Sequence, residues 1–118
     1  MLKVRDREEY KRIIKSSELV LVDFHSDSNP ESRYFSMVLE DFAWRFRKYI
    51  KLVRVDFDEA KEIIEMENVD STPKVRLYFN GRCIFEQDGC FMDYEKDMTV
   101  LRRGIRSVLK KYGLRYKI

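Results

Sequence analysis

The sequence has few residues of the kinds that build membrane spans, disulfide frameworks and metal sites. No run of about eighteen apolar residues occurs, so no segment is expected to cross a bilayer. Residues 1–10 are charged and lack the apolar core of a secretory signal peptide. Only two cysteines are present, which without a leader is typical of reduced thiols. We therefore expect a cytoplasmic protein, with the nucleus as the alternative location, and no membrane partner.

Cysteine and histidine are too sparse to predict a metal site or a cofactor. Cys83 and Cys90 are seven residues apart, and an extended strand through Cys83 would hold them beyond the reach of a disulfide. We expect two ordinary, half-buried thiols. His25 is the single histidine, and a lone His without cysteine or paired carboxylates indicates neither a metal ligand nor a general base. We expect His25 in a surface loop, with no metal and no cofactor bound.

Apolar residues make up 44% of the 118 residues and aromatic residues 14%, which is enough for one folded domain over residues 1–118. Charge is unevenly distributed, because no acid follows Asp97 while seven Lys and Arg do. Such a face suits solvent and the negative end of a helix dipole, which we favour, or alternatively nucleic acid or an acidic protein. The predicted basic surface consists of Arg102, Arg103, Arg106 and Lys110.

Hydrophobic periodicity divides the chain into alternating helices and strands. The first predicted helix begins after a capping box at Asp6 and ends at Ser16–Ser17. The other predicted helices cover residues 30–49, residues 59–67 with Asp58 as the N-cap, and a last stretch that begins at 94 or 96 and ends at 112. The predicted strands cover 19–24, 52–57, 75–79 and 82–87, the last two joined by a hairpin at Asn80–Gly81. Trp44 lies off the apolar stripe of the second helix, and we expect it to pack under a neighbouring loop. This order implies a mixed sheet with helices on both faces.

The junction between the first predicted strand and the second helix is the most informative stretch. Leu19 to Phe24 is a nearly continuous apolar run, typical of a strand buried on both faces. After a short polar loop come Asn29 and Pro30, which are favoured at the N-cap and first position of a helix. A strand that ends at a helix N-terminus forms a site suited to anions and thiolates.

Two segments together resemble the thioredoxin family. The first is Val22-Asp23-Phe24 with the helix start that follows it. The second is Val69-Asp70-Ser71-Thr72-Pro73-Lys74-Val75 followed by Phe79-Asn80-Gly81, which is similar to the family's cis-proline loop and hairpin. The resemblance covers nearly the whole chain. It implies the thioredoxin fold, an α/β fold with a mixed, four-stranded central sheet and helices on both faces.

The resemblance also implies that the family's dithiol is missing. When the chain is aligned on Val22-Asp23-Phe24, Asn29 and Ser32 occupy the two positions of Cys-x-x-Cys, and Pro30 stands one position earlier than the family's proline. An amide has no redox couple and Ser32 has no evident base, so dithiol–disulfide exchange is excluded at these positions. Asp23 matches the family's buried aspartate and Arg54 its lysine. We expect these two residues to form a buried ion pair with no thiol to serve.

We predict a redox-inactive binding or adaptor module rather than an enzyme. In the family, the residue before the cis-proline pairs with an extended peptide, and this strand addition needs no cysteine. The predicted partner is another protein or an extended peptide, held at Asn29, Pro30, Ser32, Thr72 and Pro73.

Two alternatives remain open. One is a thiol–disulfide oxidoreductase that acts through Cys83 or Cys90. The other follows from a likeness to the thioredoxin-like protein of the spliceosome, which also lacks Cys-x-x-Cys and has proline directly after the first position of that tetrapeptide. This likeness implies a component of an RNA-containing assembly, which the basic last helix would contact.

Overall fold

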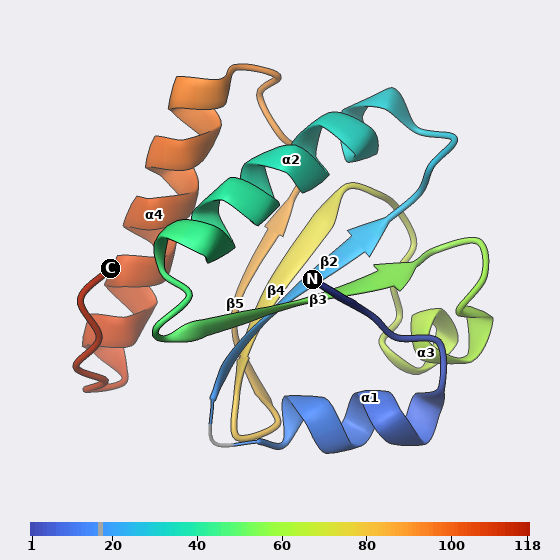
Figure 1. Cartoon of the computed structure of the whole chain (residues 1–118), viewed down its shortest axis with the longest axis horizontal. Coiled ribbons are helices and arrows are strands. Elements are labelled where there is room, and N and C mark those ends of the chain that lie inside the picture. The colour runs from blue at the N-terminus through green and yellow to red at the C-terminus, as the bar shows by residue number, and fades with distance from the viewer. Residues whose placement is uncertain (17) are drawn as a thin grey trace.

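The computed structural model describes residues 1–16 and 18–118, so Ser17, expected to help end the first helix, lies outside the described residues. A mixed sheet lies at the centre, with its strands in the order β1-β3-β2-β4-β5 (Figure 1). The strands are β1 (Leu2–Lys3), β2 (Leu19–His25), β3 (Ile50–Asp56), β4 (Lys74–Phe79) and β5 (Arg82–Asp88). The helices are α1 (Arg7–Ile14), α2 (Pro30–Arg45), α3 (Lys61–Met66) and α4 (Tyr94–Lys111).

The central strand β2 is buried on both faces of the sheet, as its apolar run predicts. It pairs in parallel with β3 and antiparallel with β4. Because side chains alternate along a strand, Leu19 and Leu21 pack into the core beneath α2 and α4, whereas Val20, Val22 and Phe24 pack into the core beneath α1 and α3. Figure 1 shows these two helix pairs on opposite sides of the sheet. The predicted thioredoxin fold is confirmed.

The sheet has five strands where the sequence predicted four. Leu2 and Lys3 pair in parallel with Val53 and Arg54, and the Val4 N–H donates to the Arg54 carbonyl at 2.9 Å. A two-residue strand is too short to show an alternating pattern, so only its pairing with β3 reveals it.

Two helix boundaries also differ from the prediction. α2 ends at Arg45 rather than near Tyr49, because the chain turns after the C-cap Phe46; both aromatic side chains still pack against the core. α3 begins at Lys61 and has no side-chain cap. The expected cap, Asp58, instead accepts a hydrogen bond from the Ser26 hydroxyl at 2.8 Å.

Trp44 does not pack under a loop, contrary to the prediction. Its side chain projects from the last turn of α2 and is 68% exposed. The guanidinium of Arg47 lies 4.1 Å from the centre of its ring.

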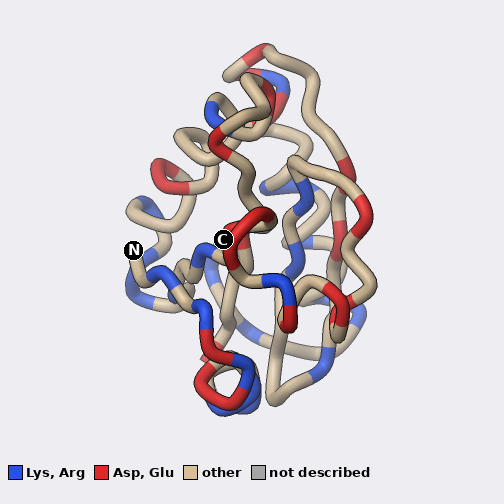
Figure 2. The backbone as a smooth tube through the Cα atoms, turned by 90° about the vertical axis from the view of Figure 1, so that its right-hand side faces the viewer, with Lys and Arg blue, Asp and Glu red and all other residues tan. Residues whose placement is uncertain are grey.

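Acidic and basic residues are interspersed over much of the surface, as on α1 at the foot of Figure 2. On α4, by contrast, Arg102, Arg103, Arg106 and Lys110 are all exposed. Within the ranges that the structure describes, no helix is both long and apolar enough to cross a membrane.

Candidate functional site

The candidate site lies where β2 ends and α2 begins, next to the loop that leads into β4. Asn29 is the N-cap of α2, and its Oδ1 accepts a hydrogen bond from the Glu31 N–H at 3.0 Å. Its amide nitrogen, Nδ2, donates to the Thr72 carbonyl at 2.8 Å and contacts the Thr72 hydroxyl at 3.2 Å. One side chain therefore starts the helix and joins it to a residue far along the chain.

The loop opposite Asn29 is held in a specific shape. The Thr72–Pro73 peptide bond is cis, and the Pro73 carbonyl accepts a hydrogen bond from the Gly89 N–H at 2.8 Å. Thr72 is half-buried and Pro73 is buried. A carbonyl oxygen carries two lone pairs, so Thr72 retains one acceptor position beyond the one that Asn29 uses.

A surface of exposed apolar side chains follows Gly89. Phe91 and Met92 are each 51% exposed, and Met92 has a positive φ of 57°. They follow Gly89, whose N–H donates a hydrogen bond to the Pro73 carbonyl.

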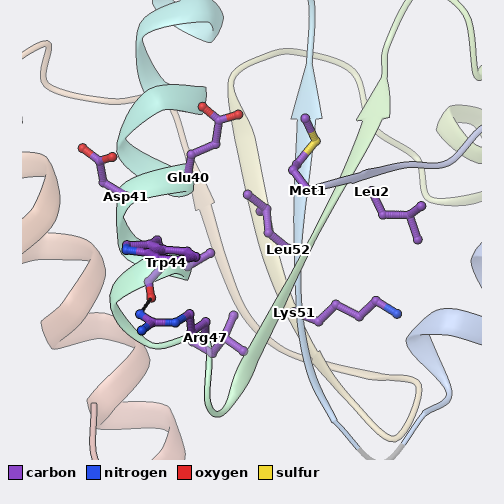
Figure 3. A pocket seen from close by; sticks show the side chains of 10 residues that line it. Met1, Leu2, Glu40, Asp41, Trp44, Arg47, Lys51 and Leu52 are labelled. Carbon is purple, nitrogen blue, oxygen red and sulfur yellow. Dashed lines mark hydrogen bonds between the residues drawn. The ribbon is translucent and has the colours of Figure 1, made fainter.

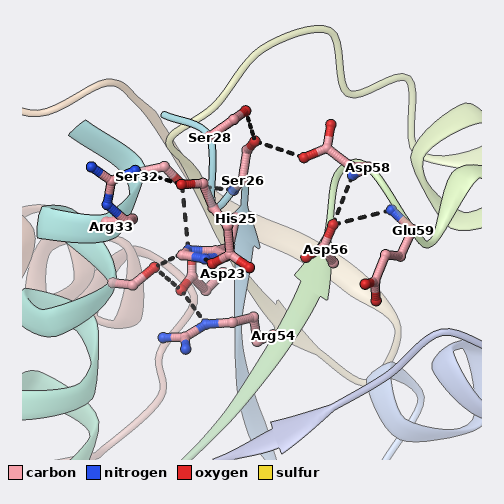
Figure 4. A network of polar contacts seen from close by, with 12 residues as sticks. Asp23, His25, Ser26, Ser28, Ser32, Arg33, Arg54, Asp56, Asp58 and Glu59 are labelled. Carbon is pink, nitrogen blue, oxygen red and sulfur yellow. Dashed lines mark hydrogen bonds and ion pairs between the residues drawn. The ribbon is translucent and has the colours of Figure 1, made fainter. Parts of the chain in front are cut away.

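Ser32 lies in the first turn of α2 and is fully buried. Its hydroxyl oxygen accepts a hydrogen bond from the Ser26 N–H at 2.9 Å and lies 3.5 Å from His25 Nδ1 (Figure 4). The Ser32 hydroxyl therefore stabilises the loop between β2 and α2. Because this hydroxyl is fully buried and already accepts a hydrogen bond from the Ser26 N–H, Ser32 has the environment of a structural residue.

Beneath this loop, a line of polar contacts runs from the surface into the core (Figure 4). Asp27 Oδ1 lies 2.6 Å from His25 Nε2, and His25 Nδ1 lies 2.7 Å from the Ser36 hydroxyl. Ser36 in turn donates to Asp23 Oδ2 at 2.6 Å. On the other side of that carboxylate, Arg54 Nε donates to the same oxygen at 3.0 Å.

Asp23 is the buried carboxyl group at the inner end of this network. Its side chain has no solvent exposure, and burial raises the pKa of its carboxyl group above the ordinary value. The Ser36 hydroxyl and the Arg54 guanidinium favour the ionised form and counteract part of that rise. At the outer end of the network, the hydrogen bond from His25 lowers the pKa of the exposed Asp27.

His25 is not in a surface loop, contrary to the prediction. It is the last residue of β2, is 6% exposed, and has partners at both ring nitrogens. Sequence reasoning also missed Ser36. Its spacing of four residues after Ser32 places both hydroxyls on one helix face, which is the signal that would have found it.

The two cysteines are unpaired with each other and differ in their surroundings. Cys83 is exposed on β5 rather than half-buried as expected, whereas Cys90 is half-buried after that strand. The Cys90 sulfur lies 4.0 Å from the Glu31 carbonyl, so it approaches the first turn of α2. Partial loss of solvent raises the pKa of both thiols, which disfavours the reactive thiolate. Among the residues described, no three His, Cys, Asp or Glu side chains gather as a metal site would require.

Comparisons with known proteins agree with this geometry. The thioredoxin family model matches residues 1–100. Thioredoxin 1 of Plasmodium falciparum (isolate 3D7) is 31% identical over 81 residues, covering 69% of this chain and 77% of that protein. A thioredoxin of Rickettsia bellii (strain RML369-C) is 28% identical over 78 residues, covering 66% and 74%.

Solved structures give the same result at the level of the backbone. A Plasmodium falciparum thioredoxin superposes with a TM-score of 0.77 at 26% identity, covering 91% of this chain and 98% of that one. A thioredoxin from Trypanosoma brucei brucei superposes with a TM-score of 0.79 at 20% identity, covering 93% and 91%, and shows the shared fold.

Proposed function

Because this chain belongs to the thioredoxin family but has Asn29 and Ser32 at the positions of the family's dithiol, we propose that it is a redox-inactive binding module. Its ligand is an extended segment of another protein, held in the groove beside Pro73. The observation that carries the proposal is the hydrogen bond from the Asn29 amide to the Thr72 carbonyl.

This hydrogen bond supports a non-redox role for Asn29, which stands at the position of the family's attacking cysteine. An amide cannot form a mixed disulfide, but it can hold a backbone carbonyl in place. Asn29 thereby occupies one acceptor position of the residue that, in the family, pairs with a bound peptide. The incoming backbone uses the second lone pair of Thr72, or displaces the Asn29 amide from the first.

The polar network behind the site supports this role by positioning Asn29. The Ser32 hydroxyl and the Asp58 carboxylate bind the backbone and side chain of Ser26, respectively, and so hold the loop that carries Asn29. Phe91 and Met92, which follow Gly89 in the chain, offer exposed apolar side chains. A partner with an extended backbone and an apolar side chain fits both features.

Two measurements test the proposal. In an insulin-reduction assay coupled to thioredoxin reductase, the wild-type protein should show no activity above background. In affinity capture, partners retained by the wild type should be lost with Pro73→Ala and retained with Lys61→Ala, an exposed control position at the start of α3. Insulin reduction by the wild type, or identical captured partners with Pro73→Ala, would contradict the proposal.

A second candidate function is thiol–disulfide exchange through Cys90, favoured by its approach to the first turn of α2. The Cys90 thiolate would attack a substrate disulfide, form a mixed disulfide and release one substrate thiolate. One external thiol would then displace Cys90 from the mixed disulfide, and a second would release the other substrate thiolate as the two external thiols form a disulfide. Any insulin reduction by this route should disappear with Cys90→Ser and persist with Cys83→Ser. Activity that survives both substitutions together would refute it.

The contact with an RNA-containing assembly also stays a prediction. Its support is the exposed basic surface of α4, formed by Arg102, Arg103, Arg106 and Lys110. Binding through these residues should weaken steeply as salt is added, because phosphate contacts release counterions. Absence of RNA retention at low salt would exclude this role.

A further inference from the structure

The outer face of α2 carries two large apolar side chains that the fold leaves uncovered. Trp44 is 68% exposed and Met37 is 61% exposed. They are seven residues apart, close to two helical turns, so both lie on the same side of α2. A groove of about 760 Å³ runs beside Trp44, and its apolar lining includes Ala43 and Leu52 (Figure 3). An exposed apolar face of this kind, bordered by charged residues, is typical of an interaction surface.

Charged residues at the two ends of this face have opposite signs. Glu40 and Asp41 precede Trp44 by about one helical turn, whereas Arg47 and Lys48 follow it. Figure 3 shows Glu40 and Asp41 on one side of the Trp44 ring and Arg47 on the other. Among the described residues, Arg47 and Lys48 form no ion pair. The basic end is therefore free to pair with acidic residues of another molecule.

The acidic end also retains the capacity to pair. Asp41 Oδ2 accepts a hydrogen bond from the Tyr94 hydroxyl at 2.8 Å. The Glu40 side chain lies 3.4 Å from Arg54 and is 43% exposed. A carboxylate offers about four acceptor positions, so both acidic side chains can also bind a basic group on a neighbouring molecule.

We propose that this face binds a second copy of the chain, with the two α2 helices antiparallel across a two-fold axis beside Trp44. In a two-fold interface, every contact between two different residues occurs twice. Glu40 and Arg47 are seven residues apart, and so are Asp41 and Lys48, with Trp44 midway between the four. The axis therefore places Glu40 of each copy opposite Arg47 of the other, and Asp41 of each copy opposite Lys48 of the other.

The winding of the chain keeps each pair on one side of the axis. Residues seven apart lie on the same side of a helix, and a two-fold axis across the interface preserves that side. α2 ends at Arg45, but the Arg47 N–H donates to the Trp44 carbonyl at 3.3 Å, so the chain continues to wind through Arg47. Parallel packing of two copies would instead set like charges opposite each other. The order of acid, tryptophan and base thus favours a second copy in the antiparallel arrangement.

This interface is separate from the groove beside Pro73. Asn29 precedes Trp44 by 15 residues, which is about 22 Å along α2. The proposal therefore does not depend on the proposed function.

Sedimentation equilibrium of the whole chain over about 1 µM to 1 mM tests the proposal. A reducing buffer prevents a disulfide between the exposed Cys83 thiols of two copies. The chain should pass from monomer to dimer and no further, because a two-fold interface is closed. Emission from Trp44, the single tryptophan, should shift to the blue over the same concentration range, as the ring leaves water.

Charge reversals locate the interface. Asp41→Lys and Lys48→Glu should each weaken the dimer by about 10- to 100-fold, because each sets two pairs of like charges opposite each other. An equimolar mixture of the two variants should regain the affinity as a mixed dimer, in which every pair again has opposite signs. Tyr94→Phe, which removes the hydrogen bond to Asp41 but not its charge, and Lys110→Glu on α4 should leave the dimer intact.

The mixture also shows whether both variants are folded, since only folded chains can restore the interface. A chain that stays monomeric at every concentration, or that associates beyond a dimer, would overturn the proposal. Dimers of undiminished affinity in both charge variants would overturn it as well. So would a mixture of the two variants that associates no better than either variant alone.

Discussion

Replacing Arg54 with methionine should destabilise the fold strongly at neutral pH. The guanidinium is one of two hydrogen-bond donors to Asp23 Oδ2, at 3.0 Å, and the second is the Ser36 hydroxyl at 2.6 Å. The Asp23 side chain is completely buried, and Oδ1 has no hydrogen-bond partner among the described residues. Removing one member of a buried ion pair typically costs about 3–5 kcal/mol, because the remaining charge is left uncompensated. Methionine retains most of the apolar stem of arginine, so the decrease in the free energy of unfolding reports on the lost charge rather than on lost side-chain volume.

The stability lost in Arg54→Met should depend on pH in a defined direction. Burial raises the pKa of Asp23 in the folded protein, whereas the unfolded chain releases this proton at the ordinary aspartate value of about 4. Between these two pKa values the folded state binds more protons, so stability falls as pH rises through that window. Loss of Arg54 raises the folded pKa further and widens the window. The penalty of Arg54→Met should therefore be small below about pH 4 and grow as pH increases.

Urea unfolding followed by circular dichroism, repeated across this pH range, measures the effect. Arg12→Met, an exposed position on α1, should change the free energy of unfolding by less than about 0.5 kcal/mol at every pH. In an Asp23→Asn background, most of the penalty of Arg54→Met should disappear, since no buried carboxylate remains. A cost below about 1 kcal/mol at pH 7, no pH dependence, or an undiminished cost in the Asp23→Asn background would refute the argument.

Three further predictions test the contacts of Ser36, Gly104 and Trp44. Ser36→Ala should lower the free energy of unfolding by about 1–3 kcal/mol and raise the pKa of Asp23 further, and an unchanged carboxyl titration by NMR would contradict this. Gly104→Ala should lower the melting temperature, because an added Cβ would lie 2.5 Å from Phe85 Cε1; a stabilised variant would show that the ring moves aside easily. Trp44 should be quenched by acrylamide nearly as well as free tryptophan, and Trp44→Ala should cost less than about 0.5 kcal/mol; blue-shifted, protected emission would show instead that the ring is covered.

The sequence predicted those parts of the fold that depend on local pattern. The apolar run Leu19 to Phe24 indicated a strand covered on both faces, and Asn29 with Pro30 marked the start of α2. Gly113, with a φ of 71°, follows the last helix as expected for a residue that must adopt a left-handed conformation. The family was also recognisable, because two motifs lie at the required positions in the chain.

Local sequence pattern gave wrong predictions for side chains whose surroundings are formed by residues distant in the sequence. His25 looked like a loop residue, but the β3 strand beside it extends β2 by one residue, and Ser36 and Asp27 satisfy its ring nitrogens. Trp44 looked like a packed aromatic, yet the chain turns at Phe46 and leaves Trp44 68% exposed, with the Arg47 guanidinium 4.1 Å from the centre of its ring. In each case the missing information was which surface lies opposite the side chain.

By itself, the sequence therefore determined the order of helices and strands, the family, and the absence of a Cys-x-x-Cys pair, because each is written in residue types at fixed spacing. Only the tertiary structure decided that Asn29 forms a hydrogen bond with Thr72, that Cys90 approaches α2, and that Trp44 and β3 line one groove. These features arise from contacts between segments separated by tens of residues. Such contacts are set by how the helices pack on the sheet, which no local pattern encodes.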